Sequence, residues 1–114
     1  MRKQFIVDVR RREILMGRPS DPRACPVALA VAQSIPLKEG VVVTVGASEV
    51  HFLNGRWDPV RKLQWSSSNV YPYALEATAI LPTQVKEFTL QFDLDPDKVA
   101  PFSFELWVPE KVLA

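Results

Sequence analysis

Cysteine and histidine are the scarcest chemically active residues in this sequence, with one of each. A single cysteine excludes an internal disulfide, and it excludes a metal site built on several cysteines. The single histidine, His51, has no second histidine and no cluster of carboxylates beside it, so no metal-binding pattern can be assembled. Paired carboxylates, a Ser-His-Asp arrangement and a glycine-rich phosphate loop are absent from the sequence as well. We therefore expect no metal, no cofactor and no enzymatic activity.

Net charge and long apolar runs are also lacking. The 14 basic and 13 acidic residues nearly cancel and leave a formal charge of +1. So small a charge produces no long-range field to attract nucleic acid or an anionic membrane, and we expect neither as a partner. No apolar run approaches the roughly 20 residues that span a bilayer, and the N-terminal segment lacks the apolar core of a signal peptide. These absences predict a location in a reducing cytoplasm.

The sequence does contain clear boundaries between short elements. Ten prolines in 114 residues fall between the apolar segments, where they separate one element from the next. A chain of this length buries roughly two-thirds of its unfolded surface, which is enough for one core. Internal repeats and low-complexity tracts are absent from the sequence. We predict a single domain over residues 1–114.

A buried helix is predicted at residues 26–34. No polar residue interrupts 27–32, and a helix that is apolar on all sides is expected in the interior of a domain. Pro26 suits the first turn of a helix, because its missing N–H costs nothing there. Pro36 cannot continue the helix and ends it.

Two residues are candidates for the N-cap of this helix. Asp21 fits if Pro22 is the first helical residue, and Cys25 fits if Pro26 is the first. We favour Cys25, because Pro26 would otherwise lie about one turn inside the helix.

The remaining apolar segments predict a sheet and a second helix. Strand-like patterns occur at residues 4–9, 41–45, 49–53 and 101–108. Apolar residues recur at helical spacing over 82–93, which predicts a surface helix with one apolar stripe. The predicted fold is therefore α+β, with a small, mainly antiparallel sheet, two helices packed on one face, and the first and last strands paired.

Two short segments have less regular patterns. Residues 14–17 are expected to form a turn or short helix closed by Gly17, with Ile14 and Leu15 in the core. Residues 73–80 fit a strand or a short helix, and propensity does not choose between them.

Three stretches together resemble a known family. They are Cys25-Pro-Val-Ala-Leu-Ala-Val31 after a Gly-x-Pro loop, Leu81-Pro-Thr-Gln-Val-Lys-Glu-Phe88 followed by Phe92-Asp93, and Pro101-Phe-Ser-Phe-Glu-Leu106. The set is similar to small uncharacterised proteins encoded by tailed bacteriophages and prophages, and the similarity covers half of the chain. The resemblance implies a phage genome and the cytoplasm of a bacterial host as the setting. It implies no chemistry.

The first candidate site is the one local concentration of positive charge. It comprises Arg10, Arg11, Arg12, Arg18 and Arg23. If the loop after Gly17 folds back toward the first of these residues, they form a basic rim beside a helix N-terminus, which suits a phosphate or a carboxylate. The other interpretation is a solvated loop whose arginines pair with Asp8, Glu13 or Asp21.

The second candidate site is an irregular loop predicted at residues 56–73. It carries Arg56, Trp57, Arg61, Trp65 and Tyr71. Aromatic and arginine side chains in such a loop can anchor a partner protein, and the competing interpretation is that they pack the loop onto the domain. Trp107, on the outward side of the last predicted strand, is a third candidate and suggests a homo-oligomer interface.

These candidates support functions of different classes. Our first hypothesis is a non-catalytic, phage-type accessory protein that binds and modulates a host protein through the aromatic loop and Trp107. The alternative is a protein that binds or sequesters a phosphorylated small ligand, such as a nucleotide signal, with the arginines. An enzyme built on Cys25 and His51 is the least favoured, because a free cysteine is usually a small buried residue.

Overall fold

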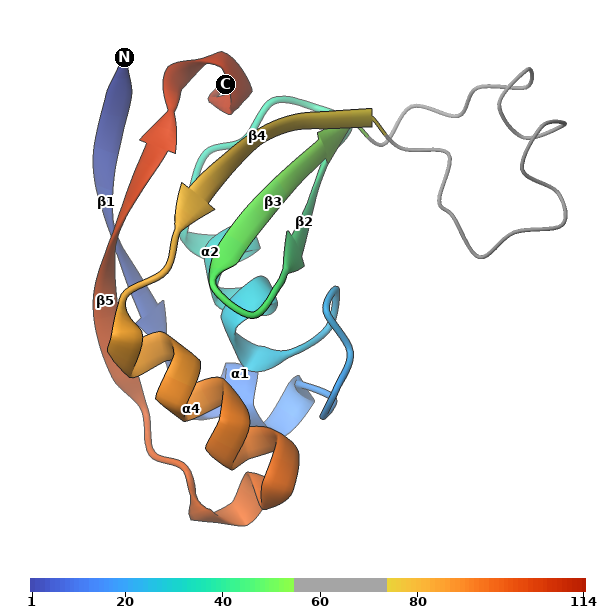
Figure 1. Cartoon of the computed structure of the whole chain (residues 1–114), viewed down its shortest axis with the longest axis vertical. Helices are drawn as coiled ribbons and strands as arrows, with labels where there is room; N and C mark the ends of the chain where they lie inside the picture. Colours follow the sequence, from blue (N-terminus) through green and yellow to red (C-terminus); the bar gives the residue numbers. More distant parts are fainter. Residues whose placement is uncertain (55–73) are drawn as a thin grey trace, which may run out of the picture.

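The first and last strands of the chain lie side by side in one ribbon. A computed structural model, shown in Figure 1, describes residues 1–54 and 74–114. Strand β1 (Arg2–Val9) pairs antiparallel with β5 (Phe102–Pro109) over the whole length of both. Alternate residues of β5 are buried, as the sequence predicts for a strand with one face on the core. The predicted pairing of the two strands is confirmed.

A second antiparallel sheet has the order β2–β3–β4. β2 (Val41–Val45) and β3 (Glu49–Asn54), where strands were predicted, form a hairpin, and Gly46 N–H closes its turn by donating to the carbonyl oxygen of Glu49. β4 (Ala74–Ile80) pairs with the other side of β3. Residues 73–80, for which propensity did not choose between strand and helix, thus contain a strand. Pairing with β3 outweighs the weak local preferences.

A side chain, and not a backbone ladder, joins the two sheets. Figure 1 shows β4 beside β5, and the two strands are in contact. Arg2, on β1, crosses β5 and donates from Nη1 to the carbonyl oxygens of Trp107, at 3.2 Å, and of Thr78 on β4, at 2.9 Å. The expected sheet is therefore present as two smaller sheets that a guanidinium links.

The central helix α2 (Pro26–Ser34) packs against both sheets, with contacts to β1 and β2. Cys25 is its N-cap, as we favoured, and the Sγ of Cys25 accepts a hydrogen bond from Ala28 N–H at 3.4 Å. The expectation of burial on all sides holds for most of the helix but is wrong for Ala32, which is exposed. The helix rests on the sheets with one side, so one position per turn still faces water.

The predicted surface helix is α4 (Thr83–Leu94). Val85 and Phe92 are buried, and Phe88 stands 4.6 Å from the ring of Phe102 on β5, centroid to centroid. Helical spacing therefore identified the apolar stripe correctly. Figure 1 shows α4 lying across the end of the two sheets, so it covers the core from below in that view.

Residues 11–16 form a third helix, α1 (Arg11–Met16), where a turn or short helix was expected from 14–17. Ile14 is buried as predicted, but Leu15 is 75% exposed, so its predicted place in the core is wrong. Successive residues of a helix point about 100° apart, and a short helix that turns Ile14 inward must turn Leu15 away. Gly17 ends the helix in extended conformation and not in the left-handed one.

Buried residues from all of these elements form a single core, mostly valines and phenylalanines, with Ile14 from α1 and alanines from β4. Its largest fully buried side chains include Val7, Val27, Phe52, Phe92 and Leu106. Two short 3-10 helices, η1 (Pro96–Lys98) and η2 (Glu110–Val112), lie before and after β5. The α+β class predicted from the sequence is confirmed, with helices packed against antiparallel sheets.

Candidate functional site

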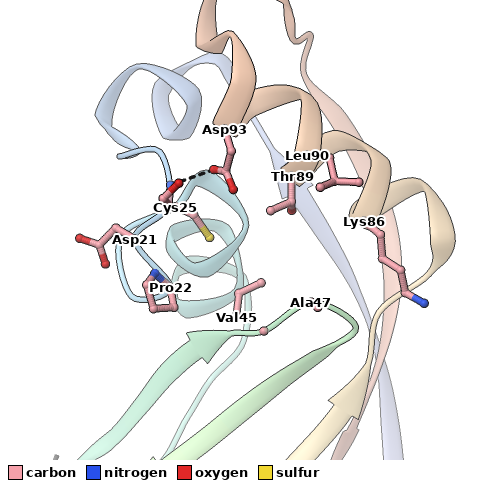
Figure 2. Close-up of a pocket in the computed structure, with 11 residues that line it drawn as sticks. Asp21, Pro22, Cys25, Val45, Ala47, Lys86, Thr89, Leu90 and Asp93 are labelled. Atoms are coloured by element: carbon pink, nitrogen blue, oxygen red, sulfur yellow. Dashed lines mark hydrogen bonds between the residues drawn. The ribbon is translucent and has the colours of Figure 1, made fainter. Parts of the chain in front are cut away.

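A hollow of about 450 Å³ opens between α4, the loop before α2 and the turn between β2 and β3. Figure 2 shows the side chains that line it, among them Asp21, Pro22, Cys25, Val45 and Asp93. These residues come from three segments that are far apart in the sequence. The hollow is therefore a product of the tertiary fold and has no local sequence motif.

The loop before α2 is fixed to α4 by its backbone. Ser20 adopts a left-handed conformation, with φ of 57°, and its N–H donates to Oδ1 of Asp93 at 2.8 Å. The Oδ1 of Asp21 accepts the backbone N–H groups of Arg23 and Ala24, at 3.1 and 3.2 Å, which makes a tight side-chain turn. These hydrogen bonds fix the loop at Ser20 and at Asp21. The loop is therefore a well-defined wall of the hollow.

Cys25 lies at the base of the hollow and is 4% exposed. Burial raises the pKa of the Cys25 thiol, the N–H groups of Ala28 and Val27 lower it, and the charges of Asp93 and Asp21 raise it, with a net increase. A thiol in this state carries little thiolate, which is the nucleophilic form. The geometry of Cys25 is that of a helix cap.

His51 lies on β3, in register with Thr44 on one side and Thr78 on the other. Its ring lies close to Gly46, where an added Cβ would stand 3.4 Å from Cε1 of His51. His51 is not among the residues that line the hollow. Within the described part of the chain, the wall around Cys25 therefore contains no histidine. The arrangement needed for a Cys-His nucleophile is not formed by these two residues.

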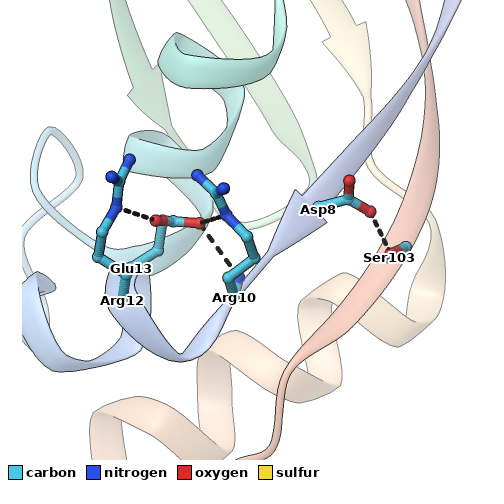
Figure 3. Close-up of polar contacts among 5 residues, drawn as sticks. All are labelled: Asp8, Arg10, Arg12, Glu13 and Ser103. Carbon is cyan, nitrogen blue, oxygen red and sulfur yellow. Dashed lines mark hydrogen bonds and ion pairs between the residues drawn. The ribbon is translucent and has the colours of Figure 1, made fainter.

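The arginine-rich segment surrounds a buried carboxylate. Glu13 is 3% exposed, and it accepts from Nε of Arg10 at 3.0 Å and from Nε of Arg12 at 3.2 Å (Figure 3). Burial raises the pKa of Glu13, but hydrogen bonds from the side chain and backbone of Arg10 and from the side chain of Arg12 lower it by more, so the pKa lies below its usual value. Glu13 is one of the acids that we expected to pair with these arginines.

The other three candidate arginines have separate surroundings. Arg11 donates from Nη1 to the carbonyl oxygen of Val99 at 3.4 Å. The backbone N–H of Arg18 donates to Ala24, and that of Arg23 donates to Asp21, within the loop before α2. All five arginines belong to the described part of the chain, and the hollow in Figure 2 is lined by none of their side chains. The hollow is therefore not lined by the predicted basic rim, although Arg18 and Arg23 lie in the loop that forms one of its walls.

Trp107 lies on the outward face of the β1–β5 ribbon, where it is 53% exposed. It stands opposite Gln4, and Ile6, which is 55% exposed, stands opposite the next outward residue of β5, Glu105. Ile6 and Trp107 are thus diagonal neighbours on one face of an antiparallel pair. The same face ends in a hydrogen bond from the hydroxyl of Ser103 to Asp8 (Figure 3). The outward position predicted for Trp107 is confirmed.

The aromatic loop lies outside the described residues. The predicted anchors there are Arg56, Trp57, Arg61, Trp65 and Tyr71, and they stay predictions.

Sequence reasoning did not identify the hollow, although one signal was present. Asp93 is an acidic residue in the last turn of α4, where the negative end of the helix dipole disfavours it. An acid at that position calls for a hydrogen-bond donor, and Ser20 N–H is the donor that the fold supplies.

Within 1–54 and 74–114, no three His, Cys, Asp or Glu side chains gather in a cluster that would hold a metal ion. Over the same ranges, none of the helices has the length and apolarity to cross a bilayer. Compared with protein-family models, curated proteins and solved structures, the chain gives no match.

Proposed function

We propose that this chain is a non-catalytic, phage-type accessory protein that binds a host protein and alters its activity. The docking surface is the ribbon face, which we define as the outward side chains of β1 and β5: Gln4, Ile6, Asp8, Ser103, Glu105 and Trp107. The observation that carries the proposal is the exposure of Trp107 and Ile6 as diagonal neighbours on this face.

The composition of the ribbon face supports a protein partner. Single exposed apolar residues are common on protein surfaces and need no explanation. Tryptophan is the residue most enriched among interface hot spots, and an apolar centre within a polar rim is the usual anatomy of an interface. Here Trp107 and Ile6 form the apolar part of the face, and Gln4, Asp8 and Glu105 are the polar residues next to them.

The rigidity of the ribbon also supports this function. Both strands bury their inner residues in the core, and Val7, Leu106 and Val108 have no exposed surface at all. An anchor on such a support loses little conformational freedom when a partner docks. The setting, a phage and its bacterial host, comes from the sequence resemblance described above.

The experiment uses the full chain as immobilised bait in a bacterial host lysate, followed by purification of the captured protein. The dissociation constant is then measured for the wild type and for Trp107→Ala. Because truncation of a hot-spot tryptophan typically costs 2 kcal/mol or more, we expect affinity to fall by about 30-fold or more. The matched control is Leu15→Ala, which removes an exposed apolar side chain from α1, away from the ribbon face.

Two results would count against the proposal. Equal affinity of the wild type and of the double variant Ile6→Ala/Trp107→Ala would show that the ribbon face is not the docking surface. A change of oligomeric state in the Trp107→Ala protein, seen by native mass measurement with no effect on the captured protein, would assign the face to a second copy of the chain.

A further inference from the structure

The hollow beside Cys25 has no role in the function proposed above. It shares no residue with the ribbon face, and its lining comes from α4, the loop before α2 and the turn between β2 and β3. Its volume of about 450 Å³ falls in the range of small-molecule pockets, which run from roughly 300 to 1,000 Å³. The feature therefore has the size of a ligand site.

The hollow is mostly apolar and is already formed. Pro22, Val45, Ala47 and Leu90 provide apolar surface from the loop, the hairpin and α4. The bond from Ser20 N–H to Asp93 holds the loop against α4, so the walls do not have to assemble around a ligand. Preformed apolar walls with a few polar groups are typical of small-molecule sites.

The charges that line the hollow are mainly negative. Asp21 and Asp93 are its acidic lining residues, and Lys86 is its basic one. Figure 2 shows Asp93 projecting from α4 above Cys25, while Lys86 lies farther along the helix with its ammonium directed away from that end. Asp93 and Lys86 are seven residues apart, which is about 10 Å along a helix. The end of the hollow near Cys25 is therefore the negative end.

The N-terminus of α2 contributes a positive potential to this end of the hollow, but its contribution is weaker than that of the carboxylates. A helix N-terminus carries about half a unit of positive charge, less than the two carboxylates near it. Its N–H groups are also partly satisfied, because Ala28 N–H already donates to the Sγ of Cys25. An anion at this end would meet the carboxylate of Asp93 and the nearby negative charge of Asp21, which disfavours a phosphorylated ligand in this hollow.

We propose that this hollow binds a small organic amine. The protonated amino group lies near Asp93, whose second carboxylate oxygen is left over after the bond to Ser20 N–H. The apolar body of the ligand lies against Pro22, Val45 and Leu90. Binding is non-covalent.

The state of the thiol agrees with this assignment. Beyond burial, the charges of Asp93 and Asp21 contribute to the raised pKa of Cys25. Both carboxylates therefore act on the atom at the base of the hollow, and a negative potential there is what a cationic group would recognise.

The first test compares three probes of nearly the same shape and different charge: tryptamine (cation), tryptophol (neutral) and indole-3-acetate (anion). Binding to the full chain is followed by amide chemical shifts in NMR titrations at pH 7. We expect tryptamine to bind with at least about tenfold higher affinity than tryptophol, because a charge-assisted hydrogen bond is about twice as strong as a neutral one and the carboxylate also attracts the charge. Indole-3-acetate should bind most weakly, and the shifts should map to residues 20–25, 45–47 and 86–93.

The second test removes the charge from Asp93. Asp93→Asn keeps an oxygen that accepts Ser20 N–H, so the loop stays in place, and we expect tryptamine to lose most of its advantage over tryptophol. The control is Asp97→Asn, which makes the same charge change on exposed η1, outside the hollow. Lys86→Met should leave tryptamine binding unchanged or strengthen it.

Several results would overturn the assignment. The first is binding of tryptophol or indole-3-acetate that is as tight as that of tryptamine or tighter. The second is a set of amide chemical-shift changes that map to residues outside the hollow. The third is the absence of any chemical-shift change at millimolar tryptamine. The probe comparison uses only the wild type, so it decides the question even if Asp93→Asn does not fold. It also leaves the ribbon face untouched, and the two proposals can fail separately.

Discussion

A side chain at Gly17 would collide with Pro26. A Cβ atom added to Gly17 would lie 2.6 Å from both Cγ and Cδ of Pro26 and 2.8 Å from its backbone nitrogen. The end of α1 therefore packs directly on the first residue of α2. This contact, and not a left-handed conformation, explains why a glycine occupies position 17.

Gly17→Ala is therefore expected to destabilise the domain. The proline ring is attached to the backbone of a buried helix and cannot turn aside, so overpacking should cost roughly 1–3 kcal/mol, less the small gain from a stiffer unfolded chain. The measurement is the free energy of unfolding from urea denaturation. Gly46→Ala is the control, because its Cβ would stand 3.4 Å from Cε1 of His51 and should change stability by less than about 0.5 kcal/mol. Equal stability of the two variants would contradict the packing argument.

Periodicity and helix-end signals carried most of the fold prediction. The strands β1 and β5, the hairpin, the cap at Cys25 and the stripe on α4 follow from local patterns, whereas the pairing of β1 with β5 was inferred from both ends of the chain being strands. Leu15 was misplaced because a run of three apolar residues does not show which of its members face inward until the helix axis is known. The break between the two sheets was also beyond local patterns, since it depends on whether β4 and β5, which lie side by side, form a backbone ladder.

The candidate site was harder to predict than the fold. Asp21, Val45 and Asp93 are brought together only by tertiary packing, and none of the three stands in a recognisable motif. The arginines were visible in the sequence, and so was Glu13 as a partner. What the sequence did not show is that Glu13 is buried, because its burial depends on the helix formed by residues 11–16.

Cys25 is expected to react slowly with iodoacetamide in the native protein. Burial and the charges of Asp93 and Asp21 raise the pKa of its thiol despite the N–H groups of Ala28 and Val27, and the side chain is almost inaccessible. We expect the native rate at pH 8 to be at least about tenfold below the rate in urea, since the exposed thiolate is the reacting form. The rate is followed by mass spectrometry of the intact chain. A native rate equal to or above the unfolded rate would instead indicate an activated nucleophile.

Glu13 is expected to make stability depend on pH in the acid range. Its pKa is lowered in the folded state: burial raises it, and the hydrogen bonds from Arg10 and Arg12 lower it by more. The ionised carboxylate therefore stabilises the fold above the unfolded pKa, near 4.5, and this contribution is lost as the pH falls through the lower folded pKa.

The variant Glu13→Gln isolates that contribution. At pH 7 it should be less stable by about 1–2 kcal/mol, between the values for exposed and buried ion pairs, because the carboxylate is buried while both arginines are more than half exposed. The measurement is the free energy of unfolding of both proteins from urea denaturation at a series of pH values. The difference in stability between the wild type and Glu13→Gln should shrink as the pH falls below 4.5. A deficit that is the same at pH 7 and pH 3 would show that packing, and not charge, is responsible.

Proline substitutions should distinguish the two edges of β1. Glu110 N–H donates to the carbonyl oxygen of Met1, so Met1 has its backbone polar groups directed at the partner strand. In an antiparallel pair every second residue has this orientation. Lys3 N–H therefore faces β5, while Gln4 N–H faces the outer edge of β1. Within the described residues, β1 pairs with no strand besides β5. Lys3 and Gln4 both have exposed side chains, which makes them a matched pair.

Lys3→Pro should therefore cost at least about 2 kcal/mol, because it removes a ladder bond and leaves a carbonyl of β5 without its donor. Gln4→Pro should cost less than about 1 kcal/mol, since a strand tolerates proline where its N–H faces outward. Urea denaturation of both variants, with Lys3→Ala and Gln4→Ala as side-chain controls, measures the difference. Because Gln4→Pro also removes a donor that an added strand would need, a lower native mass for this variant at unchanged stability would place a second copy of the chain at the outer edge of β1. The opposite order of cost, with Gln4→Pro the more damaging, would mean that this edge is already occupied in the folded monomer.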